Sequence, residues 1–294
     1  MINSKKFVLF VLVCIQILFG INFAASKIIV AKMNPILWSD VRFLLAGIIM
    51  LIVTLIMRRP HPPITKDFFI PISILSILGM ALGQGLFLVG LKYTTSINSA
   101  IILTMIPILT LMVVVLRKQE DLTFNKFIGF VLSFFGVLLM RNVSDFQMGG
   151  ETLLGDFLVL GGAFCFALYI SFGKKYFMKF DNMWTTTWMF LISGVAMLVP
   201  NISKLGELTD QTYDSIFLAA AAYSIIGATL LTYFLNNWAL KRAASGHVAI
   251  FIYLQPVVAG VIGYIFLEEP VTFRMGICSI LILTGLLFSL SKNN

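Results

Sequence analysis

Apolar residues fill most of the chain in about ten long runs, and short polar connectors separate these runs. A membrane-spanning helix needs about 20 mainly apolar residues, which is the length of the runs. The runs lack the strict alternation over about ten residues that strands of a membrane barrel require. The pattern predicts spanning helices at 6–26, 35–57, 68–90, 94–116, 124–140, 155–176, 182–200, 214–238, 246–267 and 271–291.

The composition agrees with an all-α integral membrane protein in a lipid bilayer. Hydrophobic residues make up 59% of the chain and charged residues 12%, whereas a soluble domain carries about 25% charged residues. The net charge of +8 is scattered over short connectors rather than gathered in one patch, so we expect no nucleic-acid partner. The three cysteines lie inside apolar runs and form no C-x-x-C pair, so we expect neither a disulfide framework nor a metal site.

The distribution of Lys and Arg predicts the orientation in the membrane. The connectors on the amino-terminal side hold fourteen of these residues and those on the opposite side hold six, so both termini are expected in the cytoplasm. The first run also has the layout of a secretory signal peptide, with Lys5 and Lys6 before it and small residues near Ala24. Its apolar stretch exceeds the usual 7–15 residues of such a signal, which favours a true span.

The second half of the chain repeats the first. A shift of 149 residues brings Pro107, Glu120 and Gly136 onto Pro256, Glu269 and Gly285. We therefore divide the chain into repeats at 1–143 and 144–294, each with five spans. Because five is odd, the second repeat crosses the membrane upside down relative to the first. Inverted repeats of this kind are an architecture of transporters, with the substrate site near the midplane between the halves.

The residues also resemble a known family. The segment "ALKRAASGHVAIFIYLQPVVAGVIGYIFLEEPVTFRMGICSILILTGLLF" resembles the closing signature of the EamA family of the drug/metabolite transporter superfamily. The segment "FGINFAASKIIVAKMNPILWSDVRFLLAG" (19–47) is similar to the first two spans of that family. The resemblance implies ten transmembrane helices as two five-helix inverted repeats, and secondary transport of a small metabolite. It leaves the substrate open.

Polar and aromatic residues inside the spans are the candidates for a substrate-binding cavity, because polar groups in a bilayer tend to face protein or water. The repeat supports some of these candidates, because the shift of 149 residues aligns Gln84 with Tyr233 and Thr104 with Tyr253. At the nearby shift of 147, Asn22 falls on Tyr169. The predicted lining is Asn22, Gln84, Thr104, Tyr169, Trp188, Tyr233, Asn237, Tyr253 and Gln255. Some of these residues could instead only join helices by hydrogen bonds.

Two prolines complete the predicted site. Pro107 and Pro256 each remove a backbone hydrogen bond inside a span, at matched positions of the two repeats. We expect them to bend or gate their helices, although a static kink that improves packing would leave the same sequence pattern.

The charged residues bear on the substrate. Asp40 and Arg42 lie in the first turns of the second span, close enough in sequence to be expected to pair near the outer surface. No carboxylate is predicted deep in a span, which favours a neutral or zwitterionic solute, such as one similar to an amino acid.

The expected function is export of such a solute by alternating access, by a monomer or homodimer in the inner membrane, without a cofactor. The alternatives are a multidrug or cation efflux carrier and a channel-like facilitator. An enzyme is not expected, because the two histidines make no catalytic pattern with a nucleophile or a metal.

Overall fold

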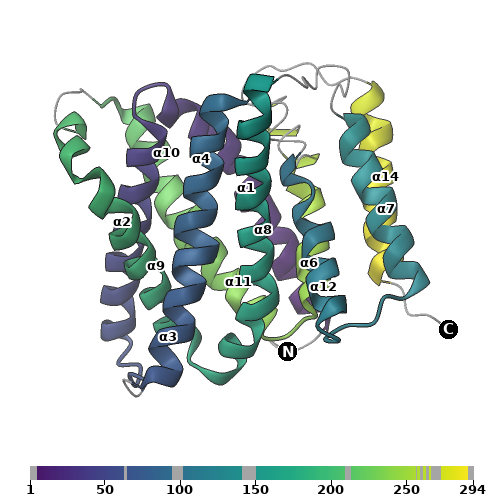
Figure 1. The fold of residues 1–294 in the computed structure, drawn as a ribbon, viewed down its shortest axis with the longest axis horizontal. Coiled ribbons are helices and arrows are strands. Elements are labelled where there is room, and N and C mark those ends of the chain that lie inside the picture. The colour runs from purple at the N-terminus through teal and green to yellow at the C-terminus, as the bar shows by residue number, and fades with distance from the viewer. Residues whose placement is uncertain are drawn as a thin grey trace.

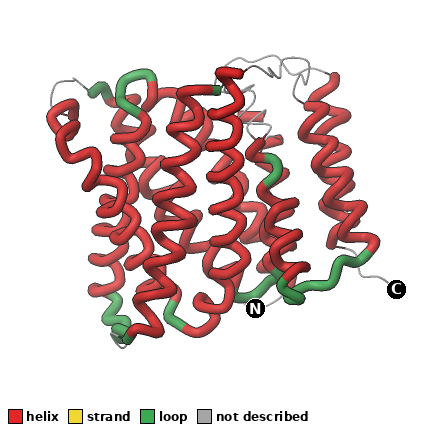
Figure 2. The backbone as a smooth tube through the Cα atoms, viewed as in Figure 1, coloured by secondary structure: helices red, strands yellow, loops and turns green. Residues whose placement is uncertain are grey.

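The computed structural model describes residues 5–62, 65–94, 102–140, 150–208, 213–255, 257–258, 261–262, 265 and 273–290. Every regular element in these ranges is a helix, and they contain no strand (Figure 2). Six helices are long and apolar enough to cross a bilayer, and four shorter apolar helices lie where the other spans were predicted. The prediction of an all-α protein with ten spans is confirmed.

The third, fourth, eighth and ninth spans are interrupted, and the seventh ends in a 3-10 segment. The first half holds α1 (Lys5–Val30), α2 (Pro35–Ile56), α3 (Lys66–Leu75) with η1 (Ser76–Leu82) and α4 (Gly83–Tyr93), then α6 (Ile106–Leu116) and α7 (Phe124–Met140). The second half holds α8 (Gly150–Lys179), α9 (Asn182–Leu198) with η3 (Val199–Leu208), then α10 (Ser215–Ile225) with η4 (Ile226–Leu231) and α11 (Thr232–Leu240), α12 (Ser245–Ile250) with η5 (Phe251–Leu254), and α14 (Phe273–Leu290).

Side-chain caps explain where several helices begin. The side chain of Asn34 accepts a hydrogen bond from the backbone N–H of Ile36 at the start of α2, and Pro35 supplies the first helical residue. Asp181 and Asp214 cap α9 and α10 in the same way. The helices pack side by side, and α1 begins on the same side of the bundle as the end of α14 (Figure 1).

The two halves are interleaved rather than placed next to each other. Equivalent spans meet in pairs, since α2 packs against α9, α6 against α12 and α7 against α14. The first span of each half packs against the third span of the other half, so that α1 contacts α10 and α11 while α8 contacts α4. A substantial part of each half's buried surface is therefore supplied by the other half.

The halves also depart from α-helical geometry at matched places. The π-helical segments η1 and η4 lie in the third and eighth spans, and a shift of 149 residues superimposes residues 77–82 on 226–231. A turn at Thr104 and Met105 interrupts the fourth span before Pro107. The 3-10 segment η5 interrupts the ninth span at the corresponding depth. The internal repeat therefore extends to the irregular parts of the backbone.

Glycines allow the close approach of α7 and α14, which form a pair at one edge of the bundle (Figure 1). A Cβ atom on Gly285 would lie 2.4 Å from Ser133 Oγ and 2.6 Å from the carbonyl oxygen of Gly129. Ser133 donates a hydrogen bond to the Ile282 carbonyl oxygen across the same interface, at 3.2 Å. Close backbone contact replaces hydrophobic burial as the source of affinity between helices in lipid.

We predict that Gly285→Ala lowers the unfolding temperature of the purified protein by several degrees. The added methyl group has no space, and overpacking costs about 1–3 kcal/mol. Gly276→Ala on the same helix is the matched control, because a Cβ atom there meets nothing within 4 Å. Thermal unfolding in one detergent measures both variants, and equal unfolding temperatures would contradict the close-packing interpretation.

Candidate functional site

Tyr233 lies at the centre of a cluster of aromatic rings in the interior of the bundle. Its ring contacts four others, which come from α1, α2, α8 and α9. The centroid distances are 6.1 Å to Phe19, 6.0 Å to Phe43, 6.4 Å to Tyr169 and 5.7 Å to Phe190. Tyr233 is itself half-buried and is the second residue after the π-helical segment η4. Five spans therefore converge on one side chain, whose own span is irregular in the turn before it.

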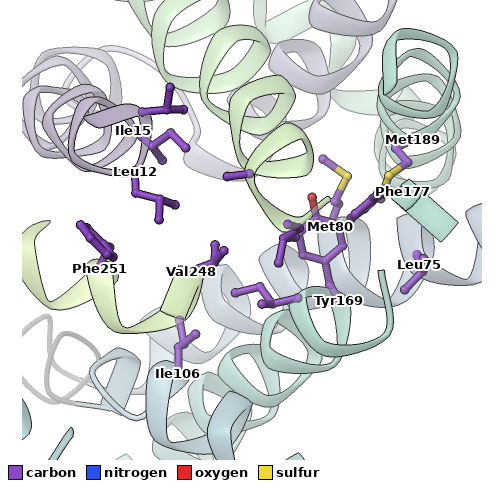
Figure 3. Packing of buried hydrophobic residues seen from close by; sticks show 14 of the residues in the cluster. Leu12, Ile15, Leu75, Met80, Ile106, Tyr169, Phe177, Met189, Val248 and Phe251 are labelled. Atoms are coloured by element: carbon purple, nitrogen blue, oxygen red, sulfur yellow. The ribbon is translucent and has the colours of Figure 1, made fainter. Parts of the chain in front are cut away.

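Tyr169 and Asn237 form a hydrogen-bonded network beside this ring cluster. The Tyr169 hydroxyl donates to Oδ1 of Asn237, and Nδ2 of Asn237 donates to Oγ1 of Thr186 at 3.0 Å. Tyr169 is 0% exposed and Asn237 is 1% exposed. Figure 3 shows Tyr169 within the packed core, where its ring lies 5.9 Å from that of Phe177. The Tyr169 hydroxyl and the Asn237 amide thus both form hydrogen bonds with protein groups in this conformation.

Gly79 allows the backbone of the third span to approach Tyr169. A Cβ atom on Gly79 would lie only 2.3 Å from Cβ of Tyr169. Gly79 belongs to the π-helical segment η1, so the irregular part of the first half packs directly on the network of the second half. Segments of π-helix are frequent at functional sites, where they change the direction of the following side chains.

Gln84, Asn22 and Thr104 lie on spans of the first half and are half-buried. Gln84 follows η1 in the same way that Tyr233 follows η4, so the repeat relates their positions. Nδ2 of Asn22 donates to Oγ of Ser26 at 3.2 Å, whereas its Oδ1 is enclosed and accepts no hydrogen bond. Thr104 lies at the turn that interrupts the fourth span.

Gln255 and Tyr253 lie at the interrupted part of the ninth span. Nε2 of Gln255 donates a hydrogen bond of 2.9 Å to Oε1 of Gln16 on α1. Gln16 is 2% exposed and was not among the predicted site residues, although it is an amide within an apolar run. Tyr253 is 2% exposed, and its hydroxyl is enclosed without a hydrogen bond. Pro256 lies outside the described residues, and Pro107 lies in the first turn of α6 after the break.

Trp188 lies apart from the central ring cluster. Its Nε1 donates to Nε2 of His61 at 3.2 Å, and its ring lies 4.9 Å from that of Phe69. These partners belong to the loop after α2 and to the beginning of α3. The described contacts of Trp188 therefore join the ends of α3 and α9 rather than the centre of the bundle.

Asp40 and Arg42 do not form the expected ion pair. Both carboxylate oxygens of Asp40 are enclosed without a hydrogen bond, and Asn201 and Lys204 are its polar neighbours. Arg42 instead lies over the Phe43 ring, with its guanidinium carbon 5.1 Å from the ring centroid. The physical reason is helical geometry, because residues two apart point about 200° away from each other. Arg42 thus joins the ring cluster, which sequence reasoning missed by pairing it with Asp40.

Charged groups tie the spans together at the two ends of the bundle. At one end, Glu120 forms a 2.9 Å ion pair with Lys126 and accepts a 2.9 Å hydrogen bond from the backbone N–H of Gly246. At the other end, Lys32 donates to Asp214 at 2.7 Å. This hydrogen bond from Lys32, together with the one from the backbone N–H of Phe217, holds the pKa of Asp214 below its ordinary value. Within the described residues, no group of three His, Cys, Asp or Glu side chains could hold a metal ion.

Ten spans in two interleaved halves, with matched helix breaks and a polar and aromatic centre, are typical of a membrane transporter. The model of the EamA-like transporter family matches residues 6–142 and 153–291. The chain therefore belongs to this family, as its sequence signature indicated. The family is one of transporters and not of enzymes, and the chain is a multi-pass membrane protein.

The relatives extend over nearly the whole chain. The sequence is 25% identical to an uncharacterized transporter of Archaeoglobus fulgidus over 293 residues, which cover 99% of each chain. It is 25% identical to the uncharacterized transporter YyaM of Bacillus subtilis over 274 residues, which cover 91% of this chain and 88% of the relative. One solved crystal structure matches with a TM-score of 0.83 over 98% of this chain and 97% of the other, at 15% identity. That match supports the fold.

We predict opposite consequences for the removal of two buried hydroxyl groups. Tyr169→Phe leaves the buried Oδ1 of Asn237 without its donor, which costs about 1–3 kcal/mol. The unfolding temperature should fall by several degrees. Tyr253→Phe is the matched control, because its enclosed hydroxyl has no partner to lose. Its unfolding temperature should stay the same or rise. A fall in both variants, or in Tyr253→Phe alone, would contradict the described network.

Proposed function

We propose that this protein exports a small organic metabolite by alternating access through a binding site at the centre of the bundle. The observation that carries the proposal is the matched irregularity of the two halves. Each half interrupts its third and fourth spans, and polar or aromatic candidates stand at these interruptions. Broken helices at the midplane are where secondary transporters expose polar groups to substrate.

The proposed binding site consists of residues from the predicted lining whose side chains are half-buried and not fully enclosed. Asn22, Gln84 and Tyr233 combine amide groups, which both donate and accept hydrogen bonds, with an aromatic ring. Tyr169 and Asn237 would support Tyr233 rather than bind the solute, since their own polar groups are hydrogen-bonded within the protein. The Tyr169 ring contacts that of Tyr233. The solute that fits such a site is similar to an amino acid or is another neutral or zwitterionic metabolite.

The proposed location is the cell (inner) membrane, with both termini in the cytoplasm, because Lys and Arg gather in the connectors on that side. In this orientation the contacts of Glu120 with Lys126 and Gly246 lie at the cytoplasmic end. Glu120 belongs to the first half and Gly246 to the second, so this contact holds the cytoplasmic ends of the halves together. Rocking of the halves would break it when the site opens to the cytoplasm.

A multidrug or cation carrier is the weaker alternative. Such a carrier usually needs a carboxylate near its site, to be shared by the proton and the cation. Among the described residues, the charged side chain at the ring cluster is the cation Arg42. A channel-like facilitator would share the fold but would not show exchange of substrate between the two sides.

We predict that Gln84→Ala and Tyr233→Ala each reduce solute flux about tenfold or more while the protein still inserts and folds. The reason is the loss of an amide or a ring that contacts the solute. Tyr93→Ala is the control, because Tyr93 lies at the end of α4 and is 52% exposed. The measurement has two stages. A comparison of metabolites in cells with and without the protein identifies the solute, and the purified variants are then tested in liposomes.

Two outcomes would contradict the proposed function. Unchanged flux in both Gln84→Ala and Tyr233→Ala would show that the proposed binding site is wrong. Passive flux far above carrier rates, without exchange of labelled solute against unlabelled solute, would show a channel instead of alternating access.

A further inference from the structure

Arg42 carries a positive charge inside a span without a protein counter-charge in the described structure. Its Nε is enclosed and makes no hydrogen bond. No described carboxylate forms an ion pair with it. An arginine stays protonated at every pH that a cell reaches, so the charge cannot be removed by titration. Charges within a membrane are costly and normally pair with another group, and an intramembrane charge therefore indicates a functional site.

The surroundings of Arg42 compensate for only part of this cost. The guanidinium lies 5.1 Å from the centroid of the Phe43 ring, and such a contact contributes about 0.5–2 kcal/mol. Tyr233 packs against the same Phe43 ring, but its neutral hydroxyl offers a dipole and no charge. Asp40, two residues earlier, points to a different side of α2. An anion that reaches the half-buried guanidinium would supply the missing counter-charge.

The depth of Arg42 in the bundle matches that of a predicted site residue. Arg42 lies seven residues after the start of α2, or about 10 Å along the helix axis. Asn22 lies eight residues before the end of α1, or about 12 Å along its axis. The end of α1 and the start of α2 are joined by a short connector, so both residues lie at a similar depth. The Oδ1 of Asn22 is enclosed and accepts no hydrogen bond, which leaves an acceptor for a donor group of a ligand.

We infer that Arg42 binds a carboxylate group of the transported solute, an assignment that rests on the proposed transport function. A guanidinium and a carboxylate form two parallel hydrogen bonds. One cation among aromatic rings matches one negative charge, whereas a phosphate dianion usually requires several positive or backbone donors. The enclosed acceptor of Asn22 suits an amino or hydroxyl group next to the carboxylate. Within the proposed function, the substrate class is thus a small zwitterion with one carboxylate group and an apolar body that packs against the rings around Tyr233.

The test is a binding experiment on the purified full-length protein and does not depend on transport. Thermal unfolding is measured with hexanoate, hexanamide and hexylamine, and with 3-phenylpropionate and its amide and amine. Inorganic phosphate is a further probe. We expect a carboxylate to raise the unfolding temperature of the wild type by a few degrees, because a ligand that binds the folded state stabilises it. We expect the amides, amines and phosphate to have smaller effects.

Three variants make the assignment specific to Arg42. Arg42→Gln should weaken carboxylate binding about 10- to 100-fold, the usual value of a charge-assisted hydrogen bond. Arg42→Lys keeps the charge without the planar fork, so it should retain a reduced response and controls for misfolding. Arg59→Gln should bind as the wild type does, because Arg59 is exposed beyond the end of α2.

The proposal is overturned if no carboxylate stabilises the wild type more than its amide, or if phosphate stabilises it more than any carboxylate. It is also overturned if Arg42→Gln responds as the wild type does. The proposed function can fail separately. If carboxylate binding depends on Arg42 but no flux is seen in liposomes, the assignment of Arg42 is supported and the proposed transport function is contradicted.

Discussion

The structure depends on one constraint, which is that backbone N–H and C=O groups find no water in the hydrocarbon core of a bilayer. Continuous helices satisfy these groups within each span. The interruptions at η1, η4, η5 and the turn before α6 leave this pattern, and the small residues of η1 and η4, such as Gly79 and Gly227, are buried against neighbouring helices. The irregular backbone of η1 and η4, the polar network and the ring cluster therefore occur together. The polar network is tolerated because its side chains are buried among the helices.

The sequence predicted the architecture well, because a bilayer imposes a length on every span and a repeat imposes a topology. The matched prolines lie close in sequence to the interruptions of the fourth and ninth spans, and their role in bending or gating stays a prediction. The π-helical segments had no such signal. The sequences "SILGMAL" and "IGATLL" are apolar with small residues, like many other stretches of the chain, and each packs against helices of the other half. Packing of this kind, such as Gly79 against Tyr169, is not visible in local sequence.

The candidate site was predictable in type but not in detail. Tyr169 and Tyr233 were predicted from matched positions of the repeat and Asn237 as a polar residue inside a span, and the structure brings these three side chains into contact. The sequence could not separate Tyr169 and Asn237, which satisfy each other, from the half-buried Gln84. It also could not identify the surroundings of Arg42. Proximity in sequence suggested a pair with Asp40, whereas the angular separation along the helix determines the true neighbours.

The bond between Gln16 and Gln255 has a consequence for synthesis in the cell. These residues are 239 positions apart, and their amides meet within the membrane. A ribosome that adds about 5–20 residues per second completes the second amide about 10–50 s after the first. During this time the first helix would meet lipid with an unsatisfied polar group. The insertion machinery, or a neighbouring helix that accepts it for a time, must shelter this helix until the ninth span arrives.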